Sequence, residues 1–480
     1  MGSKDAFFCT FCSLLLFCFS SKCLSSELDL PQTALVEVDA SWEVSRKIPD
    51  TLFGLFFEEI NHAGAGGIWA ELVSNRSNSQ FDKHSSWKLK NSVALRMEIL
   101  CENCPAGGVG IYNPGFWGMG HGFRKELIYM LLELRPQFLR FPGISHHDEV
   151  DTIIIEPFVK DVLDSLEFAR GSAESTWGSV RSAMGHPERF PLKYVAIGNE
   201  DCGKEFYRGN YLKFYDAIRK AYPDIQMISN CDGSSRPLDH PADLYDFHVY
   251  TSAANLFIMK NKFDRTSRIG PKVFVSEYAV NEQRDAGKGS LLASLAEAAF
   301  LTGLEKNSDV VQMASYAPLF VNDNDSTWNP DAIVFNSWQQ YGTPSYWVQT
   351  YFRESSGSVI HPITISSRYS DSLAASAITW QDSEDIFLRV KIVNFGPNAV
   401  NLTISSRGLQ DGVNTAKSTV TVLTSGNFLD ENSFSEPNKV VPVESELPNA
   451  AEVMEAVLPP FSFTSFDLAL DQYSKLVAEM

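Results

Sequence analysis

The pattern of apolar and polar residues changes once along the chain, at about Leu373. Before that point, short continuous apolar runs alternate with segments whose apolar residues recur at helical spacing. The runs are Thr51–Ile60, Phe138–Phe141, Tyr194–Ile197, Ile225–Ser229, Tyr245–Tyr250, Val273–Ser276 and Val310–Leu319. Such runs are typical of strands buried on both faces, and their alternation with helices predicts a parallel α/β sheet.

The segments between these runs predict helices and a barrel. Apolar residues recur at helical spacing in Phe123–Leu134, Val150–Ala169, Tyr211–Ala221 and Ser290–Leu304. This alternation favours a (β/α)8-type barrel, but only seven strand runs can be found. Since strand number, tilt and shear are linked in a barrel, a missing strand either opens the sheet or forces a tighter closure. We therefore expect an α/β barrel that lacks one strand.

After Leu373, apolar and polar residues alternate singly and turn signals replace helices. This pattern predicts an all-β sandwich. The expected strands are Ala374–Trp380, Ile386–Asn394, Ala399–Ser405, Lys417–Leu423 and Phe461–Leu468. The early segment Leu35–Val44 alternates in the same way and could join this sandwich. We therefore divide the chain into N-terminal strands at 26–50, a barrel at 51–350 and a C-terminal β-sandwich at 351–480.

Residues 1–25 predict a signal peptide. Lys4 precedes the apolar run Ala6–Phe19, and small residues follow at Ser20–Ser26. The run is too short to span a bilayer comfortably. We therefore expect a secreted protein of the extracellular matrix or cell wall.

Four of the eight cysteines lie in the predicted signal region. Cys101 and Cys104 favour a local disulfide in a secreted chain, whereas Cys202 and Cys231 could be buried thiols or a bridge between barrel loops. Secretion also makes three glycosylation sequons usable, at Asn75, Asn324 and Asn401.

The net charge of the 480-residue chain narrows the range of partners. It is −19, which argues against nucleic acid and anionic membrane surfaces. It suits a neutral or weakly charged substrate such as a polysaccharide.

Two glutamates follow strand runs and are the candidate catalytic residues. Glu200 follows Tyr194–Ile197, and Glu277 follows Val273–Ser276. Either one alone could be a solvated loop residue or a helix cap. Together, at the ends of parallel strands, they favour a retaining glycosidase with one acid/base and one nucleophile. Asn199 could bond a sugar hydroxyl, and Tyr278 could donate to the nucleophile.

Other polar residues also lie at predicted strand ends. Glu58 and Glu59 precede a glycine-rich turn that contains His62, which could equally be an ordinary loop histidine. His248 and Tyr250 are two residues apart and therefore share one face of their strand. That face could meet a ligand or fill the barrel core.

Six stretches resemble one known family, the plant α-L-arabinofuranosidases of glycoside hydrolase family 51. They are FFEEINHAGAGGIWAELVSN from Phe56, LRFPG from Leu139, WGSVRSAMGH from Trp177, VAIGNEDCG from Val195, DFHVY from Asp246 and VSEYAV from Val275. The resemblance implies a (β/α)8 barrel with a β-sandwich. It also implies retaining removal of non-reducing terminal α-L-arabinofuranosyl residues from cell-wall arabinans and arabinoxylans.

By this resemblance, Glu200 is the acid/base and Glu277 the nucleophile. Five residues would line the arabinose subsite: Glu59, Asn199, His248, Tyr250 and Gln349. The two carboxyl groups should lie roughly 5–5.5 Å apart, as retaining chemistry requires. No metal or organic cofactor is implied.

The chain departs from the family pattern at two places. Met119 runs directly into Gly120, so that residues 76–119 keep only the start of an inserted β module. Gly143 is joined directly to Ile144, where the family continues through a further helix, strand and loops. A shortened, glycan-binding form without turnover is therefore one alternative. Another retaining glycosidase of the same barrel type, such as a β-xylosidase, is a second.

Overall fold

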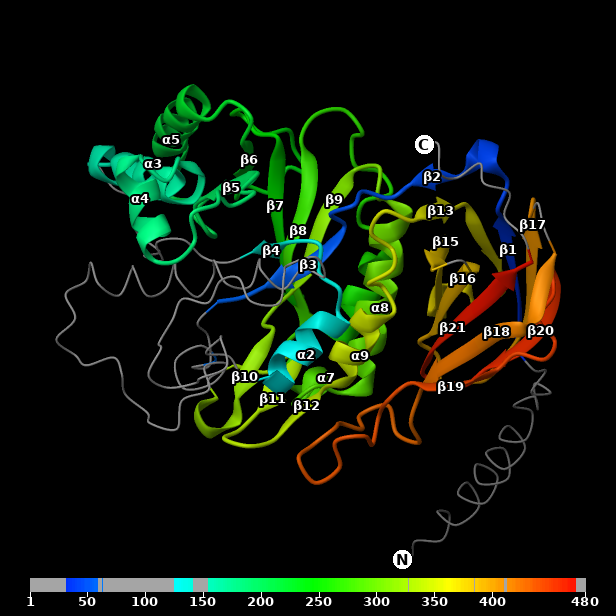
Figure 1. The fold of residues 1–480 in the computed structure, drawn as a ribbon. Coiled ribbons are helices and arrows are strands. Elements are labelled where there is room, and N and C mark those ends of the chain that lie inside the picture. Colours follow the sequence, from blue (N-terminus) through cyan, green and yellow to red (C-terminus); the bar gives the residue numbers. More distant parts are fainter. Residues whose placement is uncertain are drawn as a thin grey trace, which may run out of the picture.

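The computed structural model describes residues 32–58, 63, 125–140, 154–326, 328–383, 385–409 and 412–471. These residues form a parallel α/β sheet with helices and, beside it, a β-sandwich (Figure 1). The signal region, the remnant of the inserted module, Cys101, Cys104, Glu59, His62 and Asn75 lie outside the described residues. Within the described ranges, no helix combines the length and the apolarity needed to cross a bilayer.

Among the described residues, the parallel sheet has seven strands, and its two edge strands, β4 (Leu139–Arg140) and β5 (Tyr194–Ile197), are not paired with each other. The others are β3 (Phe53–Phe56), β6 (Gln226–Ser229), β7 (Leu244–Thr251), β8 (Lys272–Val280) and β9 (Val311–Tyr316). Their order is β4-β3-β9-β8-β7-β6-β5, and every neighbouring pair is parallel. Each predicted strand run overlaps one of them. No described strand lies between β4 and β5, so the expected barrel lacking one strand is confirmed.

Helices cover this sheet. The α-helices are α2 (Lys125–Glu133), α3 (Glu156–Arg170), α4 (Thr176–Ala183), α5 (Tyr207–Ala221), α6 (Ala253–Ile258), α7 (Gln283–Ala286), α8 (Leu291–Lys306) and α9 (Pro344–Thr350). Four of them, α2, α3, α5 and α8, overlap predicted helices, whereas the short α4, α6, α7 and α9 were not predicted. Serine hydroxyls cap α4 and α6: Ser175 accepts from the Gly178 N–H, and Ser252 from the Asn255 N–H.

The sandwich consists of two sheets, and the first described strand belongs to it. One sheet has the order β14-β1-β17-β20, with β1 at Gln32–Asp39, β14 at Ile363–Ser366, β17 at Val400–Arg407 and β20 at Val453–Leu458. The predicted strand at Leu35–Val44 was too long: β1 ends at Asp39, whose side chain accepts from the Ser41 N–H, and Trp42–Val44 form a 3-10 helix. Alternate β1 residues, including Val36 and Val38, are buried in the sandwich core.

The second sheet of the sandwich has seven strands in the order β19-β18-β21-β16-β15-β13-β2. They are β2 (Arg46–Lys47), β13 (Val359–His361), β15 (Leu373–Asp382), β16 (Asp385–Asn394), β18 (Val413–Leu423), β19 (Val443–Glu446) and β21 (Ser462–Leu470). A small sheet after β9 contains β10 (Phe320–Asn322), β11 (Ile333–Phe335) and β12 (Gln340–Gly342).

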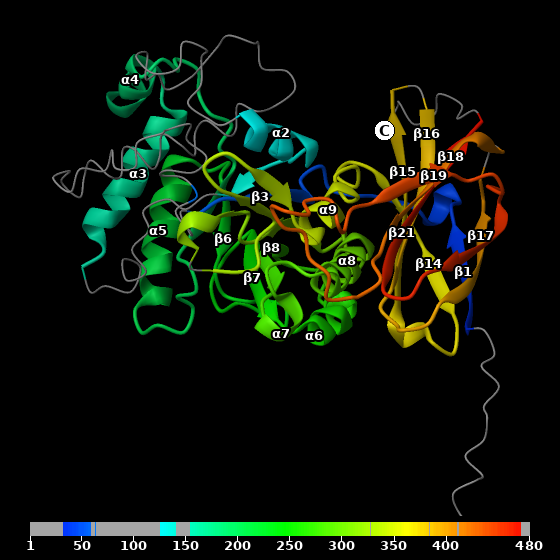
Figure 2. The same cartoon turned by 90° about the horizontal axis from the view of Figure 1, so that it is seen from below.

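Helix α8 lies between the parallel sheet and the sandwich (Figures 1 and 2). It is apolar nearly all round, as expected for a helix buried on both sides. Its Glu305 forms an ion pair with Lys391 of β16, and both side chains are completely buried. The Ser355 and Ser376 hydroxyls also donate to Glu305. Burial lowers the pKa of Lys391, against the attraction of Glu305. The two parts of the molecule are therefore joined by a buried charge pair as well as by apolar packing.

Candidate active site

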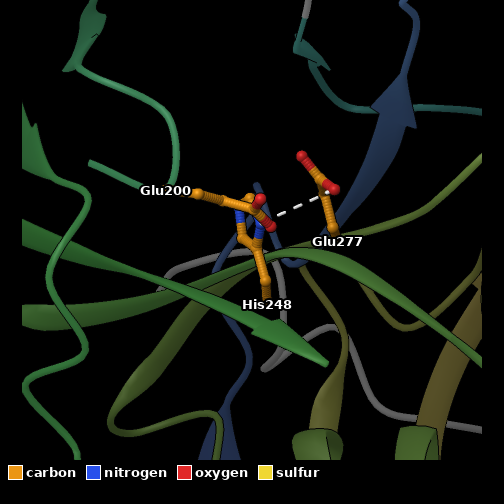
Figure 3. A group of neighbouring side chains, drawn as sticks. All are labelled: Glu200, His248 and Glu277. Atoms are coloured by element: carbon orange, nitrogen blue, oxygen red, sulfur yellow. Dashed lines mark hydrogen bonds and ion pairs between the residues drawn. The ribbon is translucent and has the colours of Figure 1, made fainter. Parts of the chain in front are cut away.

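Side chains from β4, β7, β8 and the loop after β5 meet near the carboxyl ends of these strands. Arg140 ends β4, Glu200 follows β5, His248 lies on β7 and Glu277 on β8. Figure 3 shows Glu200, His248 and Glu277 pointing toward one another. One carboxylate oxygen of each glutamate and one ring nitrogen of His248 all lie within 4.8 Å of one another. A parallel sheet brings the carboxyl ends of its strands to one edge, which explains how residues far apart in sequence meet here.

Glu277 is held by two hydrogen bonds in a buried position. Its side chain is 9% exposed. Arg140 Nη1 donates to Oε1 at 2.7 Å, and the Tyr250 hydroxyl donates to Oε2 at 2.7 Å. The Arg140 guanidinium also bonds Asn199 Oδ1 at 3.0 Å and lies 4.5 Å from the centroid of the Phe56 ring. A cation on one oxygen and a hydroxyl donor on the other fix the orientation of this carboxyl group.

Glu200 has a different environment. Its side chain is 60% exposed, and its oxygen Oε1 lies 3.0 Å from His248 Nδ1. Its backbone has a φ of +58°, which is uncommon for a residue other than glycine. Gly198, with a φ of +88°, and the bond from the Asn199 N–H to Asp201 shape the same turn. One glutamate is thus buried and fixed, and the other faces an open side.

His248 lies between the carboxylates and carries a proton. Its Nε2 is 2.9 Å from Asp246 Oδ2, and its Nδ1 is 3.5 Å from Glu277 Oε2. Burial opposes the charged ring, but the hydrogen bond and charge of Asp246, together with Glu277, raise the pKa of His248 to about 9. Asp246 also accepts from the Ser276 hydroxyl, and its pKa is lowered in spite of its burial. His248 is therefore an imidazolium at neutral pH.

Glu200, His248 and Glu277 are also close enough together to bind one cation. A histidine binds a metal ion through a neutral ring nitrogen. Without a cation, the pKa of about 9 leaves His248 protonated at neutral pH, so that a cation would have to displace this proton to bind at Nδ1.

A small polar hollow of about 120 Å³ lies beside Glu200 and His248. Asp232 and Asp246 supply two further carboxylates to its lining. The hollow therefore offers oxygen acceptors next to the exposed glutamate, which suits a ligand rich in hydroxyl groups.

The other predicted site residues have varied positions. As described above, Asn199 accepts from Arg140, and Tyr250 donates to Glu277. Gln349 lies on α9, where its Oε1 accepts from the Tyr278 hydroxyl at 2.9 Å. The expectation that Tyr278 donates to Glu277 was wrong, because successive residues of a strand point to opposite sides. Tyr250 makes that bond instead. Glu277 is also not at the end of its strand, since β8 continues to Val280.

Three residues of the site were not predicted: Arg140, Asp246 and Trp328. Arg140 is the next-to-last residue of the predicted strand Phe138–Phe141, so that a charged residue near a strand end was the available signal. Asp246 precedes His248 by two residues, so that strand alternation placed both on one face. The Trp328 ring lies 5.4 Å from that of Tyr250, in an irregular segment whose sequence carries no such signal.

A parallel barrel-type sheet with two carboxylates at its carboxyl edge, one buried and one exposed, is the arrangement of a barrel-type glycoside hydrolase. Comparisons with known proteins identify the family. Residues 144–268 match the family described as "Alpha-L-arabinofuranosidase 1 domain", and residues 276–462 match "Alpha-L-arabinofuranosidase C-terminal domain". The chain is 45% identical to Alpha-L-arabinofuranosidase 1 of Arabidopsis thaliana, over 96% of this chain and 95% of that protein. It is 42% identical to Alpha-L-arabinofuranosidase 2 of the same plant, over 92% of each.

The chain therefore belongs to the α-L-arabinofuranosidases of glycoside hydrolase family 51. Solved structures share its fold. An arabinose-bound GH51 α-L-arabinofuranosidase has a TM-score of 0.73 at 20% identity, covering 91% of this chain and all of that one. The arabinose complex of the Thermotoga maritima α-L-arabinofuranosidase has a TM-score of 0.65 at 17% identity, covering 92% of this chain and all of that one.

The alignments also measure the internal losses. The alignment with the first Arabidopsis relative extends over 645 positions, which is 165 more than the 480 residues of this chain. At least that many positions of the relative therefore have no counterpart here. This deficit agrees with the two departures at Met119 and Gly143 and with the missing strand between β4 and β5.

Proposed function

We propose that this chain is a retaining exo-acting α-L-arabinofuranosidase in which Glu277 is the nucleophile and Glu200 the acid/base. The distance of at most 4.8 Å between a carboxylate oxygen of each carries the proposal. Retaining enzymes hold their carboxyl groups about 5–5.5 Å apart, whereas inverting enzymes need about 6.5–9.5 Å to admit a water. The environments of the two glutamates support the division of roles.

The reaction would proceed in two displacements. Glu277, ionised and oriented by Arg140 and Tyr250, attacks the anomeric carbon while Glu200 gives its proton to the leaving oxygen. Glu200 must start this step protonated, and His248 Nδ1, 3.0 Å from its Oε1, helps to orient the carboxyl group. In the second step, Glu200 deprotonates a water that attacks the glycosyl-enzyme and releases arabinose.

The substrates follow from the relatives' names and from the charge of the chain. Its relatives are arabinofuranosidases, and a structural neighbour contains arabinose. We propose arabinans and arabinoxylans of the cell wall as the polymers, since both suit a protein with a net charge of −19. Glu59, Asn199, His248, Tyr250 and Gln349 would line the arabinose subsite.

Secretion and glycosylation are part of the same proposal. A disulfide joins Cys202 to Cys231, as expected for an oxidising compartment. Asn324 and Asn401 are both exposed, so that the two sequons within the described residues are accessible.

The lack of pairing between β4 and β5 in the described sheet raises the alternative of a protein without turnover. The contacts of Glu277 favour activity, because Arg140 comes from the β4 edge and Asn199, its second partner, follows β5 at the other edge. The Arg140 side chain therefore bridges the ends of β4 and β5, the two edge strands of the described sheet. A closed barrel is not needed to hold these polar groups together.

The test is hydrolysis of an aryl α-L-arabinofuranoside by the purified mature protein, with an aryl β-xyloside in parallel. We expect release of arabinose with retained configuration by NMR, little hydrolysis of the xyloside, and loss of activity in Glu277→Ala. A folded protein that hydrolyses neither substrate would refute the proposal. Preference for the xyloside would identify a β-xylosidase instead.

A further inference from the structure

The strand that leads to Glu200 has only one partner strand. Within the described part of the sheet, β5 is hydrogen-bonded to β6 alone. In a closed barrel every strand has two neighbours. We call residues 198–206, which connect β5 to α5 and include Glu200, the Glu200 loop. Among the described strands, the one at which the loop begins is therefore paired on one side.

Two connections join the ends of β5 and β6 at this point. The Tyr207 hydroxyl donates to the carbonyl of Ile197 at 3.0 Å and accepts from the N–H of Asn230 at 3.1 Å. The second connection is covalent, a disulfide between Cys202 in the Glu200 loop and Cys231 just after β6. Cys202 is two residues from Glu200, so that this crosslink lies next to the residue that must deliver the proton.

The backbone of Glu200 needs such a constraint. A φ of +58° is strained for a residue with a side chain, and such strain persists only where the surroundings impose it. Within the loop, Asp201 supplies local support by accepting from the Asn199 N–H and pairing with Lys204 at 2.7 Å. The disulfide attaches this locally shaped turn to the neighbouring strand.

Glu277 is linked to the Glu200 loop indirectly, through Arg140, which also bonds Asn199, and through His248. Glu277 itself lies on β8, an interior strand between β7 and β9, and is held by Arg140 and Tyr250. A perturbation at the end of β5 should therefore separate the two glutamates functionally, affecting proton transfer more than nucleophilic attack.

We propose that the Cys202–Cys231 disulfide is the positioning element for Glu200, and that its reduction disables the acid/base step while leaving the nucleophile in place. The assignment of Glu200 as acid/base and Glu277 as nucleophile rests on the proposed function. Cys202 is exposed, whereas Cys231 is buried, so that a reductant reaches the bond from the side of Cys202. A dithiol supplies two electrons: it forms a mixed disulfide, then closes to its own disulfide and leaves two cysteine thiols.

The first test does not require activity. Amide hydrogen exchange is compared in the oxidised protein, in the protein treated with dithiothreitol, and in the double variant Cys202→Ser, Cys231→Ser. Exchange should increase by about tenfold or more across residues 198–206 in the reduced and variant forms, and stay unchanged across 272–280. Unchanged exchange in the Glu200 loop would overturn the proposal, whatever the enzyme does.

The second test separates proton donation from attack. A 2,4-dinitrophenyl arabinofuranoside has a leaving group that needs no proton, whereas a 4-methylphenyl arabinofuranoside needs one. Because general acid catalysis contributes about 10²–10⁴-fold, and a shift of about 1 Å can cost about a hundredfold, reduction should lower kcat/KM for the 4-methylphenyl substrate by about 10–100-fold. For the dinitrophenyl substrate, kcat/KM should fall by less than about threefold.

Controls and contrary outcomes are distinct. Azide attacks the glycosyl-enzyme without a general base, so that it should restore kcat of the reduced enzyme on the dinitrophenyl substrate. Dithiothreitol should not change the serine double variant further. An equal loss on both substrates would show general unfolding and overturn the proposal, as would no loss on either. If the oxidised enzyme hydrolyses neither substrate, the proposed function fails, and the exchange measurement still decides whether the disulfide positions the loop.

Discussion

Replacing His248 with glutamine should change how the stability of the protein depends on pH. The pKa of His248 is raised from its ordinary value of 6.5 to about 9, because Asp246 and Glu277 outweigh its burial. The protonated ring therefore stabilises the fold fully below about pH 6.5, and this contribution is lost as the pH rises through 9. Since one pKa unit corresponds to about 1.4 kcal/mol, the loss between about pH 7 and about pH 10 should be about 2.5 kcal/mol.

The assay is urea unfolding of wild type and His248→Gln at both pH values. The difference in free energy of unfolding should shrink by about 2.5 kcal/mol from the lower to the higher pH. His361→Gln is the matched control: burial lowers the pKa of His361 to about 4, so that this ring is neutral over the whole interval and its difference should stay constant. A constant difference for His248→Gln as well would refute the assignment of an imidazolium between the two carboxylates.

Three further substitutions test other parts of the structure. Lys391→Met should lower the free energy of unfolding by about 3–5 kcal/mol, because Glu305 stays buried without its cation; adding Glu305→Leu should recover most of that loss, and equal urea midpoints would contradict the prediction. Burial raises the pKa of Glu297 to about 8, so the fold loses stability as the pH rises from 4.5 to about 8. The free energy of unfolding of Glu297→Gln should therefore exceed that of the wild type by about 4 kcal/mol at pH 8 and by nothing near pH 4. A gain independent of pH would argue against a buried proton. Arg140→Lys should lower kcat/KM by about a hundredfold with an unchanged melting temperature, because an ammonium cannot reproduce the two guanidinium bonds to Glu277 and Asn199. Wild-type kinetics would show that the pair of bonds is not needed.

The fold was predictable because its signals are local. Each strand of the parallel sheet overlaps a short apolar run, and counting these runs predicted the seven strands that the described residues form. Continuous apolar runs do not show where a strand ends, however. The run Val273–Ser276 gave no sign that β8 continues through Glu277 to Val280, because tertiary packing extends the strand. The short helices α4 and α6 depend on serine caps and carry too few residues to show a period.

The site was predictable where function leaves a polar residue at the end of an apolar strand. Glu200 and Glu277 directly follow predicted apolar runs and His248 lies within one, although the roles of all three stay predictions. Contacts between distant segments are not written in any local pattern. Arg140 reaches Glu277 across the sheet, and Tyr250 replaces Tyr278 as the hydroxyl donor, because pairing of strands decides which side chains meet. The state of Cys202 and Cys231 was open for the same reason: a disulfide depends on the distance between two loops.

The place of β1 in the sandwich affects how the protein is made. This strand lies in the middle of its sheet, between β14 and β17, and Val38 pairs with Ile363. A ribosome adds about 5–20 residues per second, so β1 must wait roughly 15 s to a minute for its first partner to be synthesised. During that interval its apolar residues and both of its edges are available to other chains. Folding in the cell therefore depends on protecting the first strand until about three quarters of the chain has been synthesised.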